Sequence, residues 1–187
     1  MNEWEDFINR CNNCEKCGLS VYRKNVVIGR GTPKPCPLMF IGEGPGEQED
    51  IQGEAFVGRA GKLLDLLLTA LEFDPSDYYI ANIVKCRPPE NRIPTQDEVS
   101  ACLPWLRFQV KYIKPSILVC LGATAAKAII DRDLKITQVR GTCIEKGGYV
   151  MIPTYHPAAV LRDNSKRLDF FRDMKLVKEK LSEIKQR

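Results

Sequence analysis

Short apolar runs alternate with longer amphipathic patterns along the chain. The runs are rich in β-branched residues and are bounded by Gly, Pro or polar turns, so they predict strands. They cover residues 26–28, 38–41, 78–84, 117–121 and 149–152. Apolar residues that recur every three or four positions predict helices over 2–12, 63–71, 99–113, 123–130 and 166–185. This alternation favours an α/β fold, a three-layer α/β/α sandwich with a mostly parallel central sheet.

The predicted elements place the candidate functional loops at one edge of the sheet. Ligands of such folds bind at the carboxyl ends of the strands, so the loops after Ile41, Val84, Leu121 and Pro153 are the positions to search. Gly147-Gly148 predicts a hairpin turn that adds an antiparallel pair to the sheet. The 187 residues contain no repeat or linker, which favours a single domain over 1–187.

The composition narrows the class of protein. Apolar residues make up 44% and charged residues 28% of the chain, which is typical of globular proteins and disfavours a disordered or fibrous one. No apolar run approaches the roughly 20 residues of a membrane span. The acidic amino end lacks the pattern of a secretory signal. We therefore expect a cytoplasmic monomer with no membrane partner. The net charge of +4 is too small to identify a nucleic-acid partner by itself.

The eight cysteines point to metal or catalysis, because disulfide frameworks belong to secreted proteins. Cys14 and Cys17 have a common ligand spacing, but Cys11 extends it to Cys11-x2-Cys14-x2-Cys17, so the spacing does not choose between the two pairs. Cys86 and Cys102 are too far apart in sequence to form a motif without the first group. Four thiolates suit zinc as well as an iron–sulfur cluster.

Several polar or aromatic residues lie in or beside the predicted loops. Residues 42–50 hold three glycines and four acids, yet they match neither a dinucleotide fingerprint nor a phosphate-binding loop. His156 is the one histidine and lies between two prolines after a predicted strand, a rigid mount for a catalytic imidazole. Asn82 lies in an apolar strand and is either a satisfied buried amide or a base-reading one. Phe56, between glycines, is either a core residue or a stacking platform.

The order and spacing of these segments resemble the family 4 uracil-DNA glycosylases of bacteria and archaea over nearly the whole chain. The segments are Gly42-Glu43-Gly44-Pro45-Gly46 with Glu49-Asp50, Gly53 through Gly61, Asn82 through Pro89 with Asn91-Arg92, Leu121-Gly122, Arg140-Gly141 and Tyr155 through Arg162. The resemblance implies an enzyme that flips uracil out of DNA and hydrolyses its N-glycosidic bond, leaving an abasic site.

The resemblance also implies roles for single residues. Phe56 would stack on the base, Asn82 would read its edge, and Gly42 and Gly44 would complete the substrate pocket. His156 would donate a hydrogen bond to uracil O2, while Glu43 and Glu49 are the catalytic carboxylates expected near the sugar. Glu49 could instead exclude the methyl group of thymine. Gly44 stands where better-known members of the wider superfamily have a water-directing aspartate, so the group that directs water is not assigned.

The same resemblance implies a metal site and a DNA-binding surface. Cys14, Cys17, Cys86 and Cys102 match the ligands of a structural 4Fe–4S cluster, with zinc as the alternative metal. The partner would be uracil-containing DNA, single- or double-stranded, with Leu161 or Arg162 filling the gap left by the flipped nucleotide. The residues expected on this surface are Lys85, Arg87, Arg92, Leu161 and Arg162, joined by Lys166 and Arg167 as phosphate contacts.

Two other kinds of function fit part of the pattern. One is a uracil-DNA-binding protein with a structural metal that either does not turn over or traps its substrate covalently. A trapping relative carries a histidine in the loop after the third predicted strand, whereas residues 90–94 here contain none. The other is a thiol hydrolase that pairs Cys120 with His156, which the apolar sequence around Cys120 disfavours.

Overall fold

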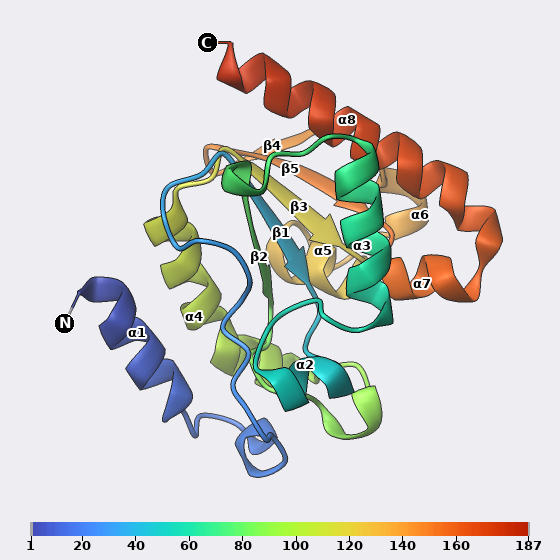
Figure 1. The fold of residues 1–187 in the computed structure, drawn as a ribbon. Coiled ribbons are helices and arrows are strands. Elements are labelled where there is room, and N and C mark those ends of the chain that lie inside the picture. Colours follow the sequence, from blue (N-terminus) through green and yellow to red (C-terminus); the bar gives the residue numbers. More distant parts are fainter. Residues whose placement is uncertain (1, 187) are drawn as a thin grey trace.

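The computed structural model describes residues 2–186, and its centre is a five-stranded sheet (Figure 1). The strands are β1 (Leu38–Gly42), β2 (Tyr78–Asn82), β3 (Ile117–Leu121), β4 (Ile144–Lys146) and β5 (Tyr149–Thr154). They lie in the order β2-β1-β3-β5-β4, and only the β4–β5 pair is antiparallel. The α/β prediction is therefore confirmed, as is the hairpin at Gly147-Gly148.

Helices cover both faces of the sheet (Figure 1). The helices are α1 (Glu3–Asn12), α2 (Glu47–Gln52), α3 (Arg59–Ala70), α4 (Gln96–Ile113), α5 (Ala123–Ile129), α6 (Ile136–Val139), α7 (Pro157–Arg162) and α8 (Arg167–Lys185). Alternate residues of β1 show the layering: Met39 and Ile41 pack with α1, α4 and α5, whereas Leu38 and Phe40 pack with α3 and α8. Every residue of β1 and β3 is buried, as expected of parallel strands covered on both sides. The arrangement is the expected α/β/α sandwich.

The strand predicted over 26–28 is wrong. This segment contacts the outer edge of β2, but it forms only an isolated bridge between Arg30 and Ile80 and a single bond from Val27 N to Lys85 O. Gly29 passes so close to β2 that a Cβ atom there would lie 2.5 Å from the hydroxyl of Tyr79. The apolar residues are buried by this crossing, not by continuous pairing, which explains why the pattern resembled a strand.

Local sequence explains where the main helices begin. Asn2 and Thr95 cap α1 and α4, and in both helices a glutamate three residues later bonds back to the cap, which satisfies amides that have no partner inside the helix. None of the helices in residues 2–186 combines the length and apolar character that crossing a membrane requires. The parallel strands β1, β2, β3 and β5 end at one edge, near α2 and α7 (Figure 1).

Candidate active site

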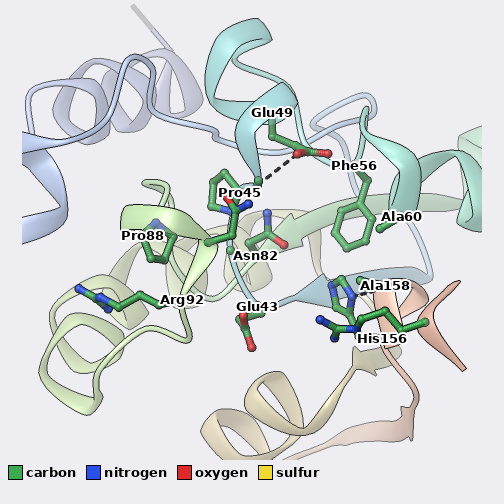
Figure 2. A pocket seen from close by; sticks show the side chains of 14 residues that line it. Glu43, Pro45, Glu49, Phe56, Ala60, Asn82, Pro88, Arg92, His156 and Ala158 are labelled. Atoms are coloured by element: carbon green, nitrogen blue, oxygen red, sulfur yellow. Dashed lines mark hydrogen bonds between the residues drawn. The ribbon is translucent and has the colours of Figure 1, made fainter. Parts of the chain in front are cut away.

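A cavity of about 350 Å³ opens at this edge of the sheet (Figure 2). Its lining is drawn from the ends of β1, β2 and β5 and from the loops around α2 and η3, the short turn Pro89–Asn91. The lining includes eight residues predicted for the site: Glu43, Gly44, Glu49, Phe56, Asn82, Arg92, His156 and Arg162. Gly42 is buried directly behind Asn82 and Phe56, whereas Lys85, Arg87 and Leu161 do not line the cavity. The structure thus brings together residues that are up to 119 positions apart in sequence, from Glu43 to Arg162.

Asn82 lines the cavity and carries an unsatisfied acceptor. It is the last residue of β2, lies opposite Gly42 in the β1–β2 register and is 2% exposed. Its Oδ1 is the one buried side-chain nitrogen or oxygen among residues 2–186 that has no hydrogen-bond partner. Leaving a buried amide oxygen unpaired costs about 1–3 kcal/mol. A polar group kept in that state beside a cavity is suited to bind a ligand that donates a hydrogen bond.

Phe56 is held in a strained backbone conformation that fixes its ring in the cavity wall. Its φ is 56°, in the left-handed region that ordinary residues seldom adopt. Arg30 donates to the carbonyl of Phe56 over 3.1 Å. The carbonyl of Phe56 also packs against Gly61 of α3, where only glycine fits, because a Cβ there would lie 1.7 Å from the carbonyl oxygen. The ring centroid lies 5.8 Å from that of His156, so one flat apolar wall faces the imidazole.

His156 is poised as a neutral hydrogen-bond donor. It caps α7, and its Nδ1 accepts a 3.1 Å hydrogen bond from the amide of Ala158. This bond assigns the proton of the neutral ring to Nε2. Burial, followed by the positive charge of Arg162, lowers the pKa of His156 to about 4. The imidazole is therefore neutral at physiological pH and can donate from Nε2 without carrying a charge.

The two predicted carboxylates have different surroundings. Glu43 follows β1, and its Oε2 accepts a hydrogen bond from the hydroxyl of Thr124. Glu49 uses both carboxylate oxygens on backbone amides, with 3.1 Å to Gly46 N and 2.7 Å to Gly58 N. These two glycines are the residues that precede α2 and α3. Glu49 therefore ties the starts of both helices together, while Glu43 remains the carboxylate beside Gly44.

Two arginines, Arg92 and Arg162, line the cavity, and Arg87 lies in the loop that precedes Arg92. Arg92 forms a two-bond ion pair with Glu98, at 2.6 and 2.8 Å. Arg162 ends α7, is exposed and lines the cavity. Arg87 lies outside the lining and donates to Asn91 over 2.8 Å. Leu161 is half-buried beside Arg162. This rim has the charge and position to contact a phosphate chain.

Lys85 is not part of that rim, which corrects its predicted contact with a DNA phosphate. The side chain is 1% exposed. Its Nζ donates to the backbone oxygen of Asn82 over 2.7 Å and to Oε1 of Gln109 over 2.5 Å. A fully enclosed ammonium that is already bonded does not reach a phosphate at the surface.

The predicted metal ligands meet in a second, smaller pocket. Cys14, Cys17, Cys86 and Cys102 all line it, together with Cys11. Three hydrogen-bond donors point at sulfur atoms: Trp105 Nε1 at Cys14, Arg23 Nη1 at Cys86, and the amide of Lys85 at Cys102, at 3.4, 3.5 and 3.2 Å. Donors directed at sulfur stabilise thiolates and tune metal–sulfur centres. The structure thus gathers the five cysteines around one pocket and directs donors at three of their sulfurs, although no three His, Cys, Asp or Glu side chains among residues 2–186 are arranged to hold a metal ion.

Cys120 is not suited to act as a nucleophile. It is completely buried in β3, and burial raises the pKa of its thiol to about 12. A nucleophilic cysteine needs an accessible thiolate. The thiol hydrolase interpretation therefore loses its nucleophile.

Comparison with known proteins agrees with this geometry. The family model of the uracil DNA glycosylase superfamily matches residues 28–180. The chain belongs to this superfamily. A type-4 uracil-DNA glycosylase of Thermotoga maritima is 47% identical over 161 residues, which cover 85% of this chain and 83% of the relative. A type-4 uracil-DNA glycosylase of Pyrobaculum aerophilum is 45% identical over 87% of this chain and 86% of its own length.

Within the superfamily the chain belongs with the type-4 uracil-DNA glycosylases. The type-5 uracil-DNA glycosylase of Pyrobaculum aerophilum is 30% identical over 88% of this chain and 86% of the relative, well below the 45% of the type-4 protein from the same organism. The resemblance drawn from the motifs is thus confirmed.

Sequence reasoning missed Thr124, which holds the carboxylate of Glu43 in this glycosylase fold. The available signal was its place: it lies three residues after Leu121, in a loop that the strand ends marked for search. A lone threonine in an alanine-rich segment carries no chemical pattern, so only the position could have identified it.

Proposed function

We propose that this chain excises uracil from DNA by gripping the flipped base between Phe56, Asn82 and His156. The observation that carries the proposal is the unpartnered Oδ1 of Asn82 in a cavity shared with an aromatic ring and a neutral imidazole. Flipping a nucleotide costs a few kcal/mol, and stacking on an aromatic side chain returns roughly 1–3 kcal/mol per base. The rigid mount of Phe56 is suited to that stacking.

Asn82 would select uracil through the pattern of donors and acceptors on the base edge. Its Oδ1 accepts from uracil N3–H, and its Nδ2 donates to O4. Cytosine offers an acceptor at N3 and a donor at N4, which leaves both ends of the amide unsatisfied. Each mismatch costs about 1–3 kcal/mol, so the pair of mismatches disfavours cytosine strongly.

His156 would stabilise the departing base. Cleavage of the N-glycosidic bond leaves negative charge on uracil, much of it on O2, and Nε2–H of the neutral imidazole is the donor for that atom. The electron pair of the broken bond stays with the base, and water supplies the hydroxyl group that ends on the sugar and, in net, the proton that ends on the released uracil. A donor fixed before the reaction stabilises this charge without reorganisation.

Glu43 would act on the sugar side of the bond. The sugar gains oxocarbenium character as the base leaves, and a nearby carboxylate stabilises positive charge and orients water. Gly44 carries no side chain that could do so, which makes Glu43 the carboxylate we assign to this role. Glu49 already accepts two backbone amides, so we assign it mainly to holding the cavity wall, where it also borders the space beside Phe56.

The rim of the cavity would bind the DNA backbone. Arg162, Arg92 and Arg87 supply positive charge, and Leu161 or Arg162 on α7 would fill the gap left by the flipped nucleotide. Because phosphate contacts release counterions, affinity for DNA should fall as salt concentration rises.

The cysteine pocket would hold a 4Fe–4S cluster with a structural role. We assign Cys14, Cys17, Cys86 and Cys102 as ligands, because three of these sulfurs receive hydrogen bonds from the surrounding protein. The bound cluster would supply cross-links, not redox chemistry. It would join the segment after α1 to the loop after β2 and to α4, and so brace the loop that carries Arg87 and Arg92.

Removing one ligand should separate the roles of the cysteines. Cys17→Ala is expected to abolish iron binding, since four thiolates are needed, whereas Cys11→Ala should keep the wild-type iron content. Metal analysis and the visible absorption of the purified proteins measure this. Stoichiometric zinc in place of iron, or loss of iron in the Cys11 variant alone, would contradict the assignment.

Filling the space behind the cavity should weaken uracil excision without unfolding the protein. A Cβ at Gly42 would lie 2.5 Å from Asn82 Oδ1 and 2.6 Å from Phe56 Cζ. Overpacking of this kind costs about 1–3 kcal/mol, so Gly42→Ala should lower kcat/KM on a uracil strand by about 10–100-fold. Gly18→Ala is the matched control, because a Cβ there meets nothing within 4 Å. Equal rates in the two variants would show that the base does not lie against Asn82 and Phe56.

The proposed activity is tested with labelled DNA strands that differ in one base. The uracil strand should acquire alkali-labile sites, and the thymine and cytosine strands should not. A complex with the uracil strand that leaves the strand uncut after alkali would identify a binding protein. An adduct that survives denaturing electrophoresis would identify a covalent trap.

A further inference from the structure

Lys85 is the most unusual buried residue outside the cavity. The side chain is 1% exposed, and its ammonium lies between the two pockets. One bond runs from Nζ to the backbone oxygen of Asn82, whose side-chain amide lies at the cavity. The backbone amide of Lys85 donates to the sulfur of Cys102, and the side chain lines the cysteine pocket.

No carboxylate balances this charge within residues 2–186. The second partner of Nζ is the neutral Oε1 of Gln109, and the groups that act electrostatically on Lys85 are Cys102, Cys11 and Cys86. An ammonium without an anionic partner is among the most costly groups to bury. The groups that can balance it are therefore the cysteine sulfurs when they bind a cluster, because thiols are deprotonated when they become metal ligands.

We propose that Lys85 is a positioning residue that links the cysteine pocket to the base-reading amide. Its charge offsets that of the thiolates, and its hydrogen bond fixes the main chain of Asn82 at the end of β2. This inference rests on the proposed role of Asn82. It extends the cluster's bracing role inward, because occupancy of the cysteine pocket then affects how accurately the amide meets uracil.

A purely structural role for Lys85 makes a different prediction. If the two hydrogen bonds of Nζ only held the fold together, Lys85→Met would lower the unfolding midpoint, and any loss of metal or selectivity would follow from that lower stability. A link between the pockets instead predicts loss of metal and of base selectivity in a protein that is still stably folded.

The experiment compares Lys85→Met with the wild type and with Lys111→Met, which alters an exposed lysine of α4. The measurements are metal retention during incubation with a chelator, kcat/KM on uracil and cytosine strands, and the thermal unfolding midpoint. We expect Lys85→Met to lose metal about 10–100-fold faster, as is usual for partners that support metal ligands. Its preference for uracil over cytosine should narrow by about tenfold. Lys111→Met should match the wild type in all three.

Gln109→Glu provides a second variant that separates the two halves of the link. It keeps an acceptor for Nζ, so the bond to Asn82 should be preserved and uracil excision should match the wild type for as long as the metal is bound. It also gives the ammonium a carboxylate partner and adds negative charge near the thiolates, so metal should be released faster. The Lys85 proposal is overturned if Lys85→Met keeps wild-type metal retention and selectivity, or if its losses are matched by a lower unfolding midpoint. Absence of uracil release by the wild type would instead overturn the proposed function.

Discussion

Replacement of His156 by alanine is expected to lower kcat for uracil excision by about 10²–10³-fold, the usual cost of one preorganised donor to a developing anion. KM should change little, because the charge on O2 develops only as the bond breaks. The same variant should lose about 1 kcal/mol of stability, since it removes the cap that accepts from Ala158 N. Single-turnover kinetics on a uracil strand and chemical unfolding measure the two effects separately.

His156→Asn is the matched control, because asparagine is a good helix cap but places no donor where Nε2 stands. It should restore stability and leave kcat as low as in the alanine variant. If the asparagine variant recovers most of the rate, the capping bond matters and the donor does not.

The acidity of His156 gives a separate check on its role. A histidine with its ordinary pKa would become charged below about pH 6.5. The lowered pKa, about 4, keeps the ring neutral from pH 8 down to about pH 5. The unfolded chain binds the proton more readily than the native one, so this residue's contribution to stability falls as pH drops from 6.5 toward 4. His156 should therefore cause no inflection near pH 6.5 in the pH profile of kcat, and the profiles of the wild type and His156→Asn should have the same shape in that range.

The second large effect is expected at Asn82. Asn82→Ala should reduce kcat/KM on uracil DNA by about 10²-fold or more, because two hydrogen bonds to the base edge are lost together. The unbound protein should not be destabilised by the loss of Oδ1 itself, since that atom has no partner in the free state. Residual activity should be spread more evenly between uracil and cytosine.

Asn82→Asp is an informative companion to the alanine variant. It keeps the size of the side chain but removes the Nδ2 donor to uracil O4, so it should also lose excision activity. Competition assays with mixed uracil and cytosine strands give the selectivity directly. A uracil rate in Asn82→Ala within threefold of the wild type would mean that another group reads the base.

The sequence predicted the fold well wherever the pattern and the turn chemistry agreed. The hairpin at Gly147-Gly148 combines a flexible turn with apolar residues on both sides, and it forms as expected. The segment 26–28 has the residue types of a strand, but it crosses β2 instead of running alongside it, and only an isolated bridge forms next to it. Pairing is a property of two segments, and a single run of residues does not report its partner.

The sequence indicated which residues would share the cavity, but not the hydrogen bonds and burial around them. Phe56, Asn82 and His156 meet as the motifs implied. The predicted phosphate contact of Lys85 was wrong because a lysine two residues before Arg87 suggests a basic surface. Its hydrogen bond to Gln109 shows that the side chain points inward. The bonds from Gly46 and Gly58 to Glu49 were equally invisible, since backbone amides leave no mark in a sequence.

Those two bonds have a thermodynamic consequence. The carboxylate of Glu49 accepts from both Gly46 N and Gly58 N, and Phe56 lies in the segment between these two glycines. The aromatic wall is therefore held in place before any nucleotide arrives, and its ordering entropy is lost during folding, not during association. We therefore expect a flipped base to meet a wall that is already formed, so that binding requires little further ordering of residues 46–58.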